Sequence, residues 1–76
     1  MSKIYIVTAT VIYKDVQNKT VEFASLDENE ANEFFIKTIS IVSLSIMPYA
    51  YEFELLEMEG AERRVIKHNS IPYKFN

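Results

Sequence analysis

Few side chains in this 76-residue sequence have the chemistry of a catalytic or metal-binding site. There is one histidine, His68, and no cysteine, which excludes a thiol nucleophile, a disulfide framework and a thiolate zinc site. His68 follows the basic segment 63–67 and is either a solvated residue or a base or metal ligand; we favour the solvated alternative. Glu52 and Glu54 have the spacing of one strand face and could bind a cation, but two acids more often form an ordinary solvated surface.

Recognisable catalytic and cofactor-binding motifs are absent from the sequence. The chain has no HExxH, Walker, GxGxxG or EF-hand pattern, and its only glycine, Gly60, cannot form a glycine-rich loop around a phosphate. We therefore predict a protein that is not an enzyme, with no catalytic residues, no cofactor and no bound metal.

The composition is that of a small globular domain: 49% of the residues are hydrophobic, 25% charged and 13% aromatic. We predict a single domain over residues 1–76, with a core at 3–68 and an aromatic tail at 69–76. A domain of this size hides only about 60–65% of its unfolded surface, so a second chain could complete the core. The first residues lack a signal-peptide pattern, and the segment 38–51 is too short to span a bilayer. We expect a cytoplasmic protein with no membrane contact.

Two strands are predicted in the first part of the chain. Residues 3–13 alternate, with apolar odd positions facing the core and even positions facing the other side. The polar run 15–19 predicts a loop, and residues 21–23 then predict a second, shorter strand. In this hairpin, Asn18 or Asp15 should take the positive φ angle.

A helix start follows the hairpin. Asp27 has the position of an N-cap, and Glu30 lies three residues later, which is the spacing of a capping box. Leu26 should pack on Ala31 as a hydrophobic staple.

The end of this helix has two interpretations. The helical spacing of apolar residues predicts a helix over 27–45. The segment 39–46, however, is rich in β-branched residues and alternates as a strand does, so a strand at this place is the alternative. Pro48 ends either element.

Two further strands are predicted after Pro48. The alternation of residues 49–56 predicts a third strand, and residues 59–62 predict a turn. Residues 63–68 then predict a short fourth strand.

The aromatic residues fall into two groups. The first group lies on the core-facing side of the strands, so core packing is favoured over a platform for stacking bases: Tyr5, Tyr13, Tyr49, Tyr51 and Phe53. Tyr73 and Phe75 lie in the tail, where aromatic side chains suit docking either on this chain or on another.

The predicted elements define an α+β fold with the order ββαββ. The helix returns the chain so that the third strand lies antiparallel beside the first, which gives an antiparallel sheet ordered 2-1-3-4 with one helix on one face. A single helix leaves the other sheet face uncovered. We predict that its apolar residues Ile4, Ile6, Ile12 and Met58, with Leu56 beside them, bind a partner.

The charges are segregated along the sequence. Residues 20–62 contain ten acidic residues and one basic residue, whereas residues 63–74 contain four basic residues and no acidic one. The net charge of −3 disfavours direct nucleic-acid binding. Glu28, Glu30 and Glu33 could instead contact a basic groove of a partner protein, or they could simply keep the protein soluble.

The chain also resembles a known class of protein in its organisation. The junction Phe23-Ala24-Ser25-Leu26-Asp27-Glu28 joins a hairpin to a helix, and Pro48 leads into the next strand. Over residues 3–58 this arrangement is similar to the small ββα-type domains of phage-encoded host-takeover proteins, such as inhibitors of bacterial RNA polymerase and anti-CRISPR proteins. The junction is similar to the alanine, serine or threonine, leucine and two acids with which those domains enter their helix. The helix alanine comes two residues later here, as Ala31.

We therefore expect a non-enzymatic protein-binding module. The resemblance implies a phage-encoded inhibitor that covers a surface of a bacterial host protein or nucleoprotein complex. The alternative is a small homodimeric structural or accessory protein, in which the uncovered sheet face is buried against a second copy.

Overall fold

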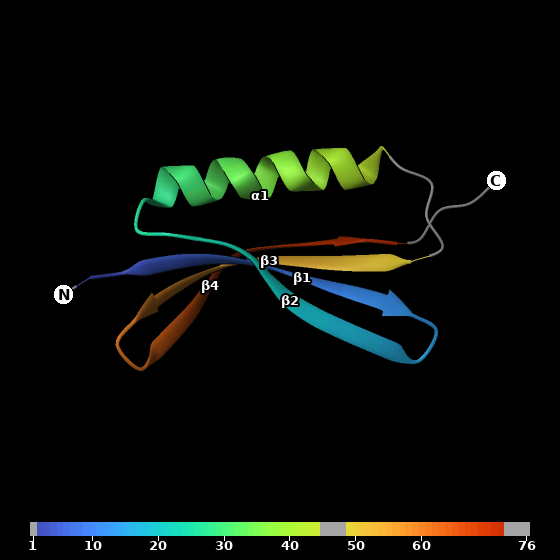
Figure 1. Cartoon of the computed structure of the whole chain (residues 1–76), viewed down its shortest axis with the longest axis horizontal. Helices are drawn as coiled ribbons and strands as arrows, with labels where there is room; N and C mark the ends of the chain where they lie inside the picture. The colour runs from blue at the N-terminus through green and yellow to red at the C-terminus, as the bar shows by residue number, and fades with distance from the viewer. Residues whose placement is uncertain (1, 45–48, 73–76) are drawn as a thin grey trace.

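The structure, a computed structural model, describes residues 2–44 and 49–72 and has the predicted α+β architecture. In chain order the elements are β1 (Ile4–Tyr13), β2 (Val16–Ser25), α1 (Glu28–Ser43), β3 (Ala50–Glu59) and β4 (Glu62–Ile71). The strands form one antiparallel sheet in the order β2-β1-β3-β4, and α1 lies across one face of it (Figure 1). The predicted fold class, element order and strand order are confirmed.

The core lies between α1 and the two central strands. Val7 of β1 pairs with Leu55 of β3, and both side chains are fully buried, as is Phe53. Ala31 and Phe35, one helical turn apart, are the buried residues of α1 that pack on them. The odd positions of β1 therefore face the core as the alternation predicts.

The aromatic row divides between core and surface. Tyr5 and Phe53 are buried, and Tyr51 packs against the core with its ring stacked on that of Phe53. Tyr13 and Tyr49 are exposed instead, and their rings meet edge to face with centroids 5.4 Å apart. The prediction of core packing is correct for Tyr5, Tyr51 and Phe53. It is wrong for Tyr13, the last residue of β1, and for Tyr49, which precedes β3.

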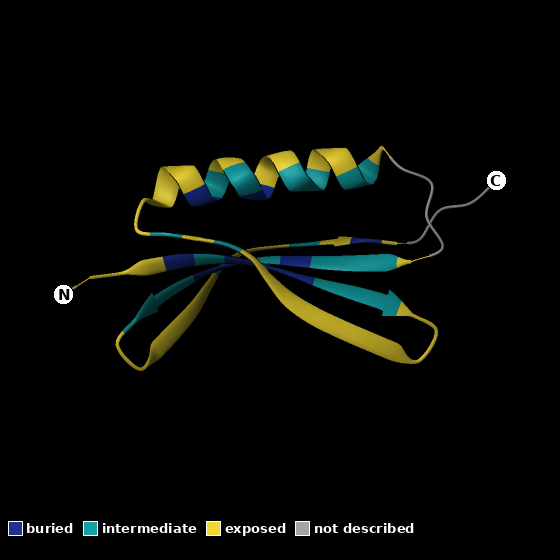
Figure 2. Cartoon of the chain, viewed as in Figure 1, coloured by how far each residue is buried: buried dark blue, intermediate teal, exposed yellow. Residues whose placement is uncertain are grey.

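The first hairpin has a shorter turn and a longer second strand than predicted. Its turn consists of Lys14 and Asp15 alone, and Lys14 takes the positive φ angle of 55° in place of Asn18 or Asp15. Residues 16–20 belong to β2, because the backbone pairs with β1 whatever the polarity of the side chains. β2 is an edge strand and is exposed along almost its entire length, shown yellow in Figure 2.

The start of α1 confirms the predicted N-cap but corrects the capping box. The Asp27 carboxylate accepts a hydrogen bond from the backbone N–H of Asn29 at 2.9 Å. Glu30 does not pair with the Asp27 backbone; the Ser25 hydroxyl accepts from Asp27 N–H at 3.0 Å and donates to Glu30 at 2.7 Å. Leu26 is 72% exposed, so the predicted staple onto Ala31 is wrong.

The segment that could have been a strand is helical as far as Ser43, and Leu44 is the C-cap. Ile39 and Val42 pack against the core, which explains why helical burial prevails over the local preference of β-branched residues. Ile46 and Pro48 lie outside the described residues. In the described part of the chain, no helix is long and apolar enough to cross a membrane.

The second hairpin contains the predicted turn at Gly60 and Ala61, with Gly60 at a φ angle of 62°. β4 continues to Ile71, three residues beyond the predicted end of the fourth strand, and Ile71 is buried in the core. The Lys67 ammonium donates a hydrogen bond to Asn32 of α1, which joins this edge strand to the helix. Tyr73 and Phe75, predicted to bind a partner, lie outside the described residues.

Candidate functional site on the open sheet face

The candidate site lies on the sheet face opposite α1, which we call the open face because no described element covers it (Figure 1). Residues paired in register project from the same face of a sheet, so the pairing identifies its members. Ile4 pairs with Met58 and Ile6 pairs with Leu56. We call these four residues the apolar end; Ile4 is 43% exposed, Ile6 and Met58 are half-buried, and Leu56 is buried.

The centre of the open face is polar and concave. Six residues of all four strands line a hollow of about 370 Å³, which we call the polar hollow: Thr10, Gln17, Lys19, Glu52, Glu54 and His68. Ile12 pairs with Gln17 and Ala50 at the far end of the face. Thr8 and Thr10 therefore separate Ile12 from the apolar end, and the four residues predicted to form one patch do not form a continuous one.

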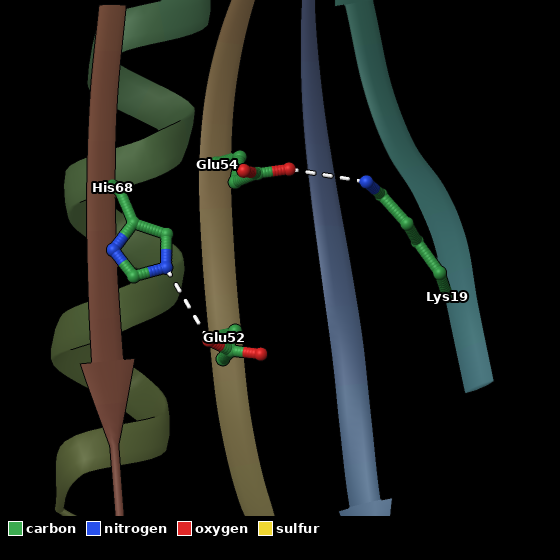
Figure 3. Close-up of polar contacts among 4 residues, drawn as sticks. All are labelled: Lys19, Glu52, Glu54 and His68. Atoms are coloured by element: carbon green, nitrogen blue, oxygen red, sulfur yellow. Dashed lines mark hydrogen bonds and ion pairs between the residues drawn. The ribbon is translucent and has the colours of Figure 1, made fainter. Parts of the chain in front are cut away.

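Two cross-strand rows build the polar hollow. One row runs Val21, Thr8, Glu54, His68, and the next runs Lys19, Thr10, Glu52, Ser70. The charged residues pair diagonally between these rows: Lys19 Nζ lies 3.1 Å from Glu54 Oε1, and His68 Nε2 lies 3.5 Å from Glu52 Oε1 (Figure 3). The first of these ion pairs passes over β1 and joins β2 to β3.

The polar hollow has more negative than permanent positive charge. Glu52 and Glu54 contribute two carboxylates, Lys19 contributes one ammonium, and His68 is charged only when protonated. The Glu52 side chain is 41% exposed and that of Glu54 is 26% exposed, so both remain accessible from solvent. Such a surface attracts cationic groups.

Sequence reasoning identified three of these six residues but not their association. The sequence singles out Glu52 and Glu54 as a pair on one strand face and His68 by itself, and it predicts a loop for Gln17 and Lys19. The two-residue turn of the first hairpin is the signal that would place Lys19, because it sets the register that brings Lys19 opposite Thr10.

A buried hydroxyl on the open face has no hydrogen-bond partner among the described residues. Thr8 is 5% exposed, and its Oγ1 forms no hydrogen bond with any residue that the structure describes. Strand alternation places its side chain on the same face as Thr10, and Thr8 lies directly between Val21 and Glu54 in its row. Buried polar groups normally have a hydrogen-bond partner, so this hydroxyl is an exception that calls for a physical reason.

The acidic residues predicted to bind a partner lie elsewhere. Glu28, Glu30 and Glu33 are exposed on α1, and α1 packs on the other face of the sheet. Glu30 is also held by the Ser25 hydroxyl. One flat partner surface cannot contact these acids and the open face together, so the predicted set divides into two separate surfaces.

Strand pairing neutralises much of the charge segregation seen along the sequence. Glu57 of β3, with a side chain 13% exposed, lies 3.0 Å from Arg64 of β4 and 3.7 Å from Lys3. Tyr5 lies opposite Glu57 in the sheet. Burial raises the pKa of Tyr5, and the charges of Glu28 and Glu57 raise this pKa further. The acidic and basic segments thus meet as neighbours.

No group of three or more His, Cys, Asp or Glu residues within 2–44 and 49–72 is placed to hold a metal ion. Comparisons with protein-family models, with curated proteins and with solved structures find no match to this chain.

Proposed function

We propose that this protein is a non-enzymatic protein-binding module whose open face binds a basic surface of a partner protein. The observation that carries the proposal is that a partly exposed apolar end, with Ile4 at its surface, adjoins a hollow with excess carboxylate on a sheet face that no described element covers. Exposed apolar residues beside polar groups are characteristic of protein-binding surfaces. The carboxylates add electrostatic selection for a cationic partner.

The polar hollow favours a different protein over a second copy as the partner. In a face-to-face homodimer the ion pairs of Lys19 with Glu54 and of His68 with Glu52 would lie in the middle of the interface. Charged residues are depleted at the centres of interfaces, because their desolvation costs free energy that pairing only partly repays. A basic partner surface instead supplies opposite charges to the two carboxylates.

The proposal extends to the type of partner. Surface-blocking inhibitors of bacterial complexes, which the chain resembles in organisation, need an accessible binding face and no catalytic residues. We propose that the target is a host protein in the bacterial cytoplasm with a basic surface of the kind that holds nucleic acid. The net charge of −3 supports a protein target over direct binding of the nucleic acid.

Light scattering and affinity capture test this proposal together. We expect the purified protein to scatter light as a monomer. In affinity capture it should retain a bacterial protein that salt elutes. The Ile6→Glu variant should not retain that protein. Ile36→Glu is the matched control, because Ile36 is 52% exposed on α1. A dimer that Ile6→Glu dissociates would contradict the proposal and establish the homodimer. Equal capture by both variants would also contradict it.

A further inference from the structure

We infer that the polar hollow is a binding site for one arginine side chain of the partner. This inference rests on the proposed function, and it adds the chemistry by which the open face recognises a basic surface. The site consists of the six residues of the polar hollow.

Glu52 and Glu54 differ in the charged groups beside them. Glu54 has a permanent cation beside it, since Lys19 lies 3.1 Å away. The ion-pair partner of Glu52 is His68, at 3.5 Å, which carries a positive charge only when protonated. His68 is thus no permanent cation, none of the described residues forms another ion pair with Glu52, and 41% of the Glu52 side chain is exposed to an incoming group. Glu52 is therefore the residue that an added cation would neutralise.

The buried hydroxyl of Thr8, next to the polar hollow in the sheet, has no hydrogen-bond partner among the described residues. Thr8 is adjacent in register to Glu54, which lines the polar hollow, and it precedes Thr10, another lining residue, by two positions on the same strand face. Its Oγ1 is buried and has no partner among the described residues, yet a hydroxyl oxygen can accept a hydrogen bond. The hydroxyl does not itself line the polar hollow, so a donor that enters between the two rows would reach it only as the neighbouring side chains rearrange.

The charge and the acceptors of the polar hollow favour a guanidinium group over an anion, a metal ion or an ammonium group. An anion would be repelled by the excess of carboxylate, and no described set of three metal ligands is present. The remaining class is an organic cation with several N–H donors. A guanidinium has five donors in a planar fork, whereas an ammonium has three on one nitrogen. The polar hollow presents several acceptors on different strands: the Glu52 carboxylate, the Thr10 hydroxyl and the Gln17 amide oxygen. A planar fork can contact more of them at once.

Titration of the isotope-labelled full chain with N-acetyl-arginine amide, followed by NMR, tests this inference. We expect saturable shifts confined to the open face. Glu52→Gln should weaken the affinity about tenfold, because a charge-assisted hydrogen bond is lost. Glu33→Gln is the matched control on α1 and should leave the affinity unchanged. N-acetyl-lysine amide should bind more weakly than the arginine probe.

Three results would overturn the inference: no saturable shift, equal affinity in Glu52→Gln and the unmodified chain, or equal affinity for the arginine and lysine probes. The apolar end separates this test from that of the proposed function. Ile6→Glu should lose the partner and keep the arginine probe, since Ile6 does not line the polar hollow. Partner capture without probe binding would refute only the arginine site, and probe binding without partner capture would refute only the proposed function.

Discussion

Lys19 of β2 and Glu54 of β3 form an ion pair of 3.1 Å that passes over β1, the strand between them (Figure 3). The pair fixes one side of the polar hollow and places a permanent cation beside Glu54. Glu52 has no such cation beside it among the described residues, so it is the carboxylate that a partner cation would neutralise first. Removing Lys19 should alter recognition more than stability.

Lys19→Gln is expected to strengthen binding of N-acetyl-arginine amide, because Glu54 becomes a second free acceptor. The free energy of unfolding should change by no more than about 1 kcal/mol, since exposed ion pairs contribute little. Lys37→Gln on α1 is the control and should alter neither quantity. An NMR titration measures the affinity and urea unfolding measures the stability. Weaker binding by Lys19→Gln would show that Lys19 helps to hold the probe and would contradict this role.

Thr8→Val should stabilise the free protein. The substitution keeps the side-chain shape and removes a buried hydroxyl that has no partner among the described residues. The expected gain in the free energy of unfolding is about 1 kcal/mol. Thr10→Val, at a less buried position on the same strand face, is the control and should give no gain. A loss of stability in Thr8→Val, measured by urea unfolding, would mean that the hydroxyl has a partner.

Ile71 should be a stabilising core residue even though it lies within the predicted tail. Ile71→Ala removes buried methyl groups and is expected to cost about 2–5 kcal/mol. Val65→Ala on the same strand is the control and should cost much less, because Val65 is largely exposed. Thermal or urea unfolding of both variants measures the difference. Equal costs at the two positions would contradict the placement of Ile71 in the core.

Tyr5 should make stability decrease at alkaline pH. Burial raises the pKa of Tyr5 above the usual 10.0, the charges of Glu28 and Glu57 add to this rise, and Lys3 opposes it. The unfolded chain loses the Tyr5 proton near pH 10, whereas the folded chain keeps it to higher pH. The stabilising contribution is therefore fully present below about pH 10 and is lost as the pH rises through the folded pKa. Urea unfolding from pH 8.5 upward should show a shallower decrease for Tyr5→Phe; an identical decrease would refute the shift.

The sequence was sufficient to predict the central strands and the helix start. β1 and β3 alternate because one side of each faces the core, and Asp27 caps α1 through a short-range hydrogen bond. The edge strands were predicted too short. Most β2 side chains contact solvent on both faces, so no hydrophobic alternation marks residues 16–20, and only backbone pairing defines them as a strand.

The candidate site depended on register, which local patterns do not specify. Glu52, Glu54 and His68 could be singled out by residue type. Lys19, however, lies opposite Thr10 because of the first turn, and His68 lies opposite Glu54 because of the second turn and the bulge between β3 and β4. The irregularity between Leu55 and Leu56 sets which β4 residue lies opposite Glu54. Such bulges change the register by one residue and leave little trace in the residue pattern.

The most direct test of the open face as a binding surface is the affinity of the captured partner for Ile6→Glu and Ile36→Glu. Both variants replace an isoleucine with a glutamate; Ile6 lies on the open face and Ile36 lies on α1. Circular dichroism should first show that both retain the fold. Titration calorimetry with the purified partner should then give a loss of about thirtyfold or more, equivalent to about 2 kcal/mol, for Ile6→Glu and no change for Ile36→Glu. Unchanged affinity in Ile6→Glu, or an equal loss in both variants, would contradict the account.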